Sequence, residues 1–266
     1  MLPRLLNVVV ALLICASAHG QSRQERGKKL IDEVVAALGG DRFLGMKDRV
    51  ESGRAYSFFR EELSGLSLAT VYTRYLENPA PGTVGLVERQ SFGKEERSGA
   101  ALFLPDKGYE ITFRGARPYP EERFERWRDS TLLNILYILR MRLEEPGLLF
   151  DAVGQDILDN LPVEIVDVTD SENRTVRVWI DQRTKLPVRQ VYYRRDPKTR
   201  QRFEEVTIFS KYRDVGQGVQ WPFNLQRLRD GQQTFQMYAD TVQINQSLKD
   251  DLFTLSPNTK VLKPLK

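Results

Sequence analysis

The stretch that decides the fold is "TVRVWIDQRTKLPVRQVYYRR", residues 175–195. Two runs rich in β-branched and aromatic residues are separated by a short polar segment, residues 182–185, and this pattern predicts an antiparallel hairpin. Asp181 is expected to accept hydrogen bonds from the backbone of the turn, and Pro187 fixes the backbone where the second strand begins. Turn residues of this kind serve the backbone, so the hairpin by itself indicates a fold and no chemistry.

Similar strand signals recur on both sides of this hairpin. Turn material such as residues 105–108 and 196–198 separates them, and the short connections favour a meander. The predicted strands are residues 47–60, 66–78, 83–92, 99–104, 108–114, 148–153, 162–168, 174–181, 187–195, 202–213, 218–229 and 233–245. A sheet of this length is expected to curl or to close.

Two segments are predicted to be helices. Residues 24–38 place apolar side chains at helical spacing and are followed by Gly39 and Gly40, which end the helix. Residues 121–145 contain no glycine or proline until Pro146, and they predict one long helix. No shift of composition, linker or repeat divides the chain, so one domain is expected.

Residues 132–139, "LLNILYIL", are apolar at seven of eight positions, so this part of the helix has no polar side. A surface helix needs only one apolar stripe, so both sides of this segment must be covered. Two interpretations remain open: a core helix packed inside a curled sheet, or a helix that borders an apolar cavity on its second side.

The first 20 residues predict a secretory signal peptide. Arg4 is followed by an apolar run and then by small residues, and we expect cleavage after Gly20 or Ala18. The apolar run is shorter than the roughly 20 residues of a spanning helix, which disfavours a retained anchor. Ile14 stands before Cys15 where a lipoprotein signal would have a small residue, which disfavours lipidation.

Cleavage would remove the only cysteine and, at either predicted position, leave at most one histidine, His19. The mature chain can then form no internal disulfide, and about 246 residues suffice for one core. After a cut behind Gly20, thiol nucleophiles, catalytic triads with histidine and zinc sites with histidine or cysteine are all excluded. Only chemistry by carboxylate, lysine, tyrosine or hydroxyl groups would then remain. We predict no metal site and no cofactor.

The charges of the chain are balanced, with 40 basic and 36 acidic residues. The densest basic stretch, residues 194–202, surrounds Asp196 and Pro197 and is typical of a solvated hairpin tip, so no nucleic-acid partner is expected. Phosphate-binding glycine loops are absent from the sequence. Carboxylate pairs such as Glu61-Glu62 lie in charged loops, so a carboxylate-dependent hydrolase is the weakest of the functions considered.

The order of several motifs resembles the outer-membrane lipoprotein-sorting proteins of the LolA/LolB-like superfamily. The hairpin "VWIDQRTKLPVRQV" is similar to a segment of that group, roughly W-x-D-x-x-T-x-x-P. "GVQWPFNLQRLRDGQQTFQMYADTVQIN", residues 218–245, resembles its penultimate hairpin, and "LKDDLFTLSPNTKVL", residues 248–262, its closing segment. The resemblance covers residues 160–260 best.

The fold class expected from the residues and this resemblance is α+β. Residues 21–266 would form a single LolA-like domain, a strongly curved antiparallel sheet of about 11 strands that forms an incomplete β-barrel around helices. The resemblance further implies a monomeric periplasmic carrier or binder that catalyses no reaction. Its apolar cavity would shield acyl chains of lipoproteins or other lipids, with a membrane protein as a possible partner. The alternative is an envelope-stress sensor or scaffold of the same fold that binds a protein partner.

The candidate residues of the cavity are large apolar side chains on the long helix and on alternate positions of the later strands. They are Phe124, Trp127, Leu132, Leu136, Leu139, Val176, Val178, Ile180, Val206, Ile208, Trp221, Phe223 and Leu225.

Overall fold

The computed structural model describes residues 22–80, 82–96, 99–196 and 198–264. The predicted signal peptide, residues 1–20, lies outside the described residues together with its cleavage positions Ala18 and Gly20. No helix in the described ranges is long and apolar enough to cross a bilayer.

One antiparallel sheet of 13 strands forms the framework, in the order β6-β5-β4-β3-β2-β1-β13-β12-β11-β10-β9-β8-β7. The strands are β1 (Asp48–Phe59), β2 (Glu62–Tyr75), β3 (Leu86–Phe92), β4 (Gly99–Phe103), β5 (Gly108–Thr112), β6 (Gly115–Pro118), β7 (Leu149–Leu158), β8 (Leu161–Thr169), β9 (Thr175–Asp181), β10 (Pro187–Arg195), β11 (Arg202–Asp214), β12 (Gln220–Arg229) and β13 (Gln232–Ile244). The sheet is thus two meanders, β1–β6 and β7–β13, joined where β1 pairs with β13.

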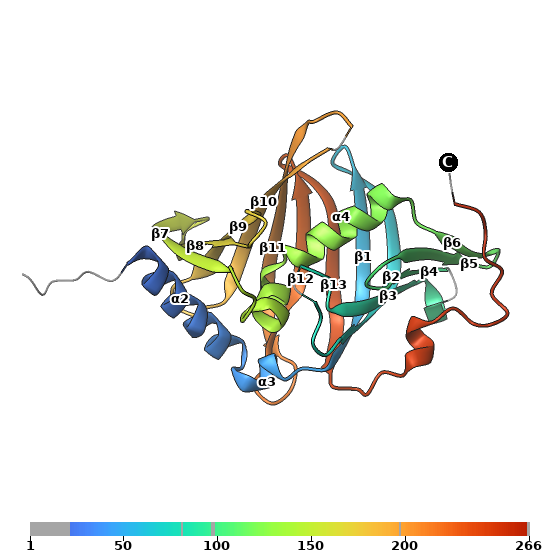
Figure 1. Cartoon of the computed structure of the whole chain (residues 1–266), viewed down its shortest axis with the longest axis horizontal. Coiled ribbons are helices and arrows are strands. Elements are labelled where there is room, and N and C mark those ends of the chain that lie inside the picture. Colours follow the sequence, from blue (N-terminus) through green and yellow to red (C-terminus); the bar gives the residue numbers. More distant parts are fainter. Residues whose placement is uncertain (1–21, 81, 97–98, 197, 265–266) are drawn as a thin grey trace, which may run out of the picture.

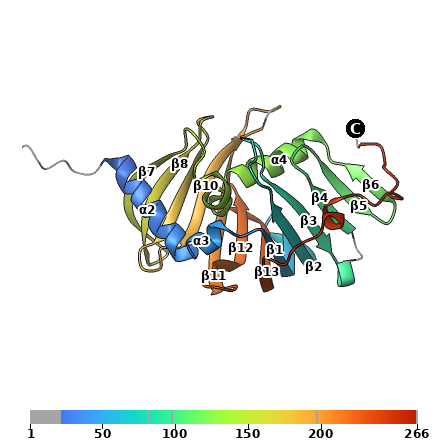
Figure 2. The ribbon, with the colours of Figure 1, turned by 60° about the horizontal axis from the view of Figure 1, so that its bottom comes forward.

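The sheet is strongly curved and open, and the helices lie on its concave side (Figures 1 and 2). The central pair β1–β13 carries a register shift between Ser52 and Gly53. A Cβ at Gly53 would lie 2.0 Å from the carbonyl oxygen of Tyr238, so only glycine permits this close approach of the two backbones. The predicted fold class, an α+β half-barrel, is confirmed.

The opening stretch of the sequence forms strands β9 and β10, as predicted. The Asp181 carboxylate accepts hydrogen bonds from the backbone N–H groups of Arg183 (2.7 Å) and Thr184 (3.2 Å), and Pro187 begins β10. The described residues form 13 strands, where a sheet of about 11 was expected. Of the 13, only β6 has no counterpart among the twelve strand segments predicted from the sequence, since its four residues are too few to show a period.

Helix α2 (Arg23–Leu38) covers the concave side of the sheet at the β7–β10 end (Figure 1). Ser22 caps it, accepting a hydrogen bond from the Glu25 backbone, while the Glu25 side chain accepts one from the Ser22 backbone. A Cβ at Gly27 would lie 2.2 Å from the Phe150 carbonyl oxygen, so the helix approaches β7 very closely. The apolar side of α2 packs against Val176, Val178 and Ile180 of β9 in the main core, and the short helix α3 (Asp41–Leu44) follows.

The prediction of one continuous helix over residues 121–145 is wrong. Helix α4 (Glu121–Leu132) ends, and Asn134 adopts an extended backbone and caps the short helix α5 (Ile135–Tyr137), which a π-helical turn, η2 (Ile138–Arg142), continues. Gln190 of β10, 1% exposed, holds the break: its side chain accepts from the Ile135 N–H (2.8 Å) and donates to the Leu133 carbonyl (3.3 Å). A buried partner on the sheet therefore replaces the missing helical hydrogen bonds.

Two short 3₁₀ helices, η1 (Lys94–Glu96) and η3 (Asp250–Phe253), complete the structure. After η3 the chain returns along strand β6. The Ala116 backbone donates to Lys260 and accepts from Leu262, and Val261 forms a parallel bridge to Ala116. The C-terminal segment therefore covers the β6 edge of the sheet.

Candidate ligand-binding cavity

A cavity of about 1060 Å³ lies on the concave side of the sheet. Strands β1–β3 and β11–β13 form its floor, and α4, which crosses in front of the central strands in Figure 1, covers it. Its apolar lining from the sheet comprises Ala55, Leu66, Ala69, Val71, Leu86, Phe92, Phe103, Val206, Trp221, Phe223, Leu225, Phe235, Met237 and Ala239. The sheet therefore offers a continuous apolar surface to this space.

Helix α4 turns a mostly polar face to the cavity. Ser130 and Thr131 line it, but both hydroxyl groups donate to the Trp127 carbonyl of the same helix, at 2.8 and 2.9 Å. Trp127 also lines the cavity, stacks on Phe103 with ring centroids 4.6 Å apart, and donates its indole N–H to Glu88 (3.4 Å). The helix that covers the cavity thus does not fill it with apolar side chains.

One end of the cavity, here called the deep end, holds the buried cation Arg49. Its guanidinium donates to Glu51 (2.5 Å), to the Tyr75 hydroxyl (2.7 Å) and to Thr73 (3.2 Å), and it lies 4.1 Å from the ring centroid of Trp221. Burial alone would lower the pKa of Arg49, but Glu51, Tyr75 and Glu88 together outweigh it and the net effect is a raised pKa. The deep end therefore holds a buried ion pair, which the apolar candidate residues did not include.

Some of the predicted site residues line the cavity and others do not. Trp127, Leu136, Val206, Trp221, Phe223 and Leu225 line the cavity. Leu139, Val176, Val178 and Ile180 are fully buried in the main core, while Leu132 and Phe124 belong to two smaller clusters under α4. Ile208 is half-buried and does not line the cavity.

Strand β11 shows why alternation alone misplaced Ile208. Its neighbour Thr207 stands opposite Arg227 and lines the cavity, and its other neighbour Phe209 stands opposite Leu225 and is buried in the core. Because successive side chains point to opposite faces, the side chain of Ile208 lies on the face away from Thr207 and Phe209. Val206, two residues before it, still lines the cavity. Both faces of this strand carry apolar residues, so the sequence did not distinguish them.

Both interpretations of residues 132–139 describe part of the structure. Ile135, Ile138 and Leu139 are packed in the core, whereas Leu136 and Tyr137 border the cavity. The Tyr137 hydroxyl accepts a hydrogen bond from the Gly85 N–H (2.6 Å), and burial raises its pKa to about 12 although the Gly85 hydrogen bond opposes this. The segment is thus attached to the β2–β3 side of the sheet.

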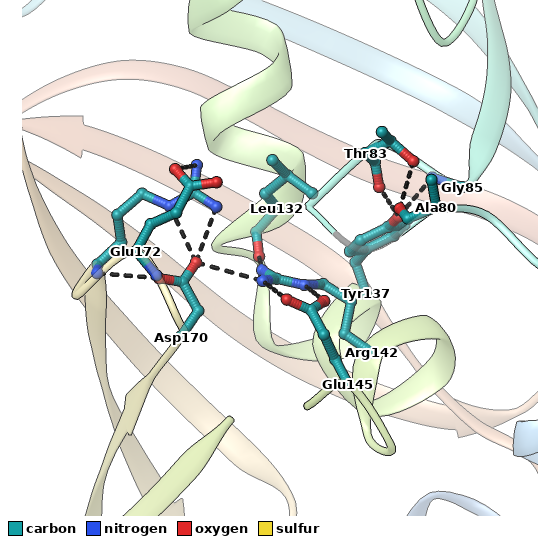
Figure 3. Close-up of polar contacts among 10 residues, drawn as sticks. Ala80, Thr83, Gly85, Leu132, Tyr137, Arg142, Glu145, Asp170 and Glu172 are labelled. Atoms are coloured by element: carbon teal, nitrogen blue, oxygen red, sulfur yellow. Dashed lines mark hydrogen bonds and ion pairs between the residues drawn. The ribbon is translucent and has the colours of Figure 1, made fainter. Parts of the chain in front are cut away.

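Arg142 attaches the same segment to the other half of the sheet (Figure 3). Its guanidinium donates to the Leu132 carbonyl at the end of α4 (2.6 Å), to Glu145 (2.6 and 2.8 Å) and to Asp170 in the β8–β9 turn (3.2 Å). Asp170 also pairs with Arg174 at 2.8 Å. Burial alone would raise the pKa of Asp170, but hydrogen bonds from Arg174 and Arg142 lower it below its ordinary value.

A second pocket of about 660 Å³ lies beyond the deep end, near residues 45–48, 74–79 and 247–248. Tyr75 lines both spaces. Arg49 holds its hydroxyl on the cavity side, and the Arg140 guanidinium lies 5.0 Å from the centroid of its ring. Burial raises the pKa of Tyr75, although the two arginines oppose this, so its phenol stays neutral. Tyr75 lies between the two spaces.

The cavity contains four glutamates, and each has a polar partner. Glu51 pairs with Arg49, Glu122 with Arg126 (3.0 Å) and Glu205 with Arg229 (2.8 Å), while Glu88 accepts from Gln90 (2.7 Å) and Trp127. Within the described ranges, no group of three or more histidine, cysteine, aspartate or glutamate side chains could hold a metal ion.

The predicted site residues did not include the charged lining of the cavity. This lining includes Arg49 and Glu51 on β1 and Arg227 and Arg229 on β12. The two arginines of β12 fall at the same alternate positions of the strand as Phe223 and Leu225. The period of two on strand β12 would have placed its arginines on the concave face. Nothing in the sequence alone indicates that α4 adds Arg123 and Arg126 to the same space.

Solved structures with a similar fold cover most of this chain. A LolA superfamily protein from Nitrosomonas europaea superposes with a TM-score of 0.53 at 10% identity, over 86% of this chain and 97% of its own. The chain has a LolA-like fold. A domain designated an outer membrane lipoprotein-sorting protein domain, from Vibrio parahaemolyticus, gives a TM-score of 0.54 at 12% identity, over 87% of this chain and 97% of its own.

A DUF1329 family protein from Desulfovibrio piger gives a TM-score of 0.59 at 12% identity, over 88% of this chain and 98% of its own. No protein-family model matches the sequence, and no curated protein matches it significantly. At these identities the similarity is one of fold alone.

Proposed function

We propose that this protein is a periplasmic carrier or binder that holds an acyl chain of a lipid or lipoprotein in the cavity and catalyses no reaction. The observation that carries the proposal is the cavity of about 1060 Å³ over an apolar sheet surface in a LolA-like fold. Burial of a hydrocarbon chain there contributes about 0.8 kcal/mol per CH₂ group, so chain length alone supplies affinity.

The state of the cavity carboxylates supports binding over catalysis. A hydrolase with two carboxylates needs one of them to carry a proton at neutral pH, which requires burial without a cation. Three of the four glutamates here are paired with arginine. Because guanidinium groups occupy their oxygens, these carboxylates do not form the pair of unpartnered, convergent carboxylates that such a hydrolase uses.

The test is the uptake of a fluorescent acyl probe by wild type and by Leu136→Arg. Leu136 borders the cavity and is 4% exposed, so a charge there is expected to abolish uptake. Leu68→Arg is the matched control, because Leu68 is 52% exposed and does not line the cavity. Far-UV circular dichroism checks the fold; a folded Leu136→Arg variant with unchanged uptake would contradict the proposal.

Leu225→Trp gives a second route to the same answer if Leu136→Arg fails to fold. Leu225 is half-buried in the cavity lining, and a larger side chain there occupies ligand space without a buried charge. We expect weaker uptake of the probe. Native mass spectrometry of protein purified from its own periplasm would then identify any co-purified lipid.

A second candidate, a sensor or scaffold that binds a protein partner, is favoured by the β1–β2 hairpin. Its end exposes four large apolar side chains, Phe59, Leu63, Leu66 and Leu68, at 52–67%. Replacing Phe59 and Leu63 by serine would abolish capture of such a partner and leave acyl-probe uptake unchanged.

A further inference from the structure

The end of the cavity opposite Arg49 is lined by four arginines, Arg123 and Arg126 of α4 and Arg227 and Arg229 of β12, which we call the arginine rim. Arg227 stands opposite Phe235 at the start of β13, and Phe235 is opposite Ser57 at the end of β1. Arg49 lies near the start of β1, over Trp221 at the start of β12. The strands therefore separate the arginine rim from the deep end.

Helix α4 begins at the same end of the sheet. Glu122 in its first turn lies 3.5 Å from Lys198, at the tip of the β10–β11 hairpin, and β11 begins beside this tip. Leu66, 61% exposed, also lines the cavity, so this end is open to solvent. The arginine rim thus surrounds the mouth of an apolar cavity.

Two of the four rim arginines already have carboxylate partners. Arg126 pairs with Glu122, and Arg229 donates to Glu205 at 2.9 Å through Nε. Arg123 and Arg227 form no ion pair within the described parts of the chain, and each instead lies over an aromatic ring, Tyr119 at 3.9 Å and Phe235 at 5.6 Å. Stacking uses the face of a guanidinium and leaves N–H donors at its edge for an anion.

We propose that the arginine rim binds the anionic headgroup of an amphiphile, a phosphate or carboxylate, while its hydrocarbon chain lies in the cavity. The inference rests on the proposed function and specifies its ligand class. Arginine suits planar or tetrahedral anions because its forked donors match two oxygens at once. The hydrocarbon chain then meets the apolar sheet surface between the rim and Arg49, so one ligand satisfies both surfaces.

The experiment compares ligands with the same chain and different headgroups. Displacement of a fluorescent acyl probe from the mature protein is measured with dodecyl phosphate, dodecylphosphocholine and dodecyl maltoside, and with inorganic phosphate alone. We expect dodecyl phosphate to bind about tenfold more tightly than the other two detergents, a preference that weakens as salt is raised because the rim is exposed.

The variant Arg123→Gln/Arg227→Gln is expected to lose this preference and to bind dodecyl maltoside as wild type does. These two positions are chosen because their replacement leaves no glutamate unpaired. Arg54→Gln is the matched control, since Arg54 is an exposed arginine of β1 that pairs with Asp240 outside the cavity. It should keep the full preference.

The outcomes separate the two proposals. Equal binding of all three detergents by wild type, or an unchanged preference in the double variant, would overturn the headgroup assignment and leave acyl-chain binding intact. Failure of every detergent to displace the probe would overturn both. Tight binding of inorganic phosphate that does not compete with dodecyl phosphate would place the anion site elsewhere and overturn the assignment too.

Discussion

The two ends of the concave sheet surface carry similar apolar residues but are filled differently. At the β7–β10 end, α2 buries Leu30, Ile31, Val34, Val35 and Leu38 against the strands and leaves a solid core. Over the central strands, α4 buries only Phe124 and Leu132, and a cavity remains. The face that a helix turns to the sheet therefore decides whether the sheet forms a core or a binding site.

The comparison also shows how the helices are held. Helix α2 is fixed along its length by apolar packing and by Lys185, which bridges Glu33 of α2 (3.0 Å) and Glu164 of β8 (2.6 Å). Helix α4 is held at its C-terminal end by Gln190 and Arg142, and farther along by the stacking of Trp127 on Phe103. These separate contacts leave space between α4 and the central strands.

The largest expected effect comes from breaking the attachment of α4. Arg142→Leu leaves the buried Asp170 and Glu145 carboxylates without their shared cation, and we expect a loss of about 3–5 kcal/mol in the free energy of unfolding. Urea unfolding measures it. Arg177→Leu, which removes an exposed pair with Asp167, should cost no more than about 1 kcal/mol. Equal losses for the two variants would contradict this role of Arg142.

The difference between solid core and cavity can be measured with two truncations. Ile31→Ala empties a fully buried site beneath α2 and is expected to cost about 2–5 kcal/mol. Leu225→Ala enlarges a space that already exists and should cost about 1 kcal/mol or less. A similar cost at both positions, from urea unfolding, would mean that the cavity is packed in solution.

Low pH should weaken the contact between Arg142 and the β8–β9 turn, because this contact depends on the Asp170 carboxylate. Because its folded-state pKa is lowered, its stabilising contribution is present above the ordinary pKa of 3.8 and is lost as pH falls through the folded value. At neutral pH, Asp170→Asn is expected to cost about 1.5–3 kcal/mol. Unfolding midpoints of wild type and variant should begin to approach each other below the ordinary value of 3.8 and converge only beneath the lowered folded-state pKa; a constant difference would assign the loss to a neutral hydrogen bond.

The smallest effect is expected at the cavity mouth. Leu66→Ser changes an exposed side chain, so the unfolding free energy should shift by no more than about 0.5 kcal/mol. Leu102→Ser, at a fully buried position of β4, is the contrasting change and should be strongly destabilising. Comparable losses would show that Leu66 is covered in solution.

Most of the strands could be predicted from the sequence because local signals define them. Hairpin turns such as residues 181–187 combine a side chain that accepts turn N–H groups with a proline, and both act within a few residues. The end of α4 was not predictable in this way. It depends on Gln190, far along the chain, whose buried amide replaces the helical hydrogen bonds at Leu133 and Ile135.

The cavity could be predicted only in part for a similar reason. Alternation identified Trp221, Phe223 and Leu225, but it does not say which helix covers them. Val176, Val178 and Ile180 show the same pattern and lie beneath α2, in the core. Balanced net charge concealed the arginine rim, because Arg123 and Arg227 meet only when α4 folds over the central strands.

The two edges of the open sheet differ, and this limits how copies of the protein can associate. The C-terminal segment already bonds to β6 through Ala116. Among the described residues, β7 pairs with no strand other than β8. Helix α2 lies against its backbone at Phe150, and its far end, with Ile157 71% exposed, is left open. Unpaired strand edges are templates for intermolecular β-pairing. Two molecules joined edge to edge at β7 would leave no equivalent edge for a third, so such pairing ends at a dimer and does not propagate into a fibre.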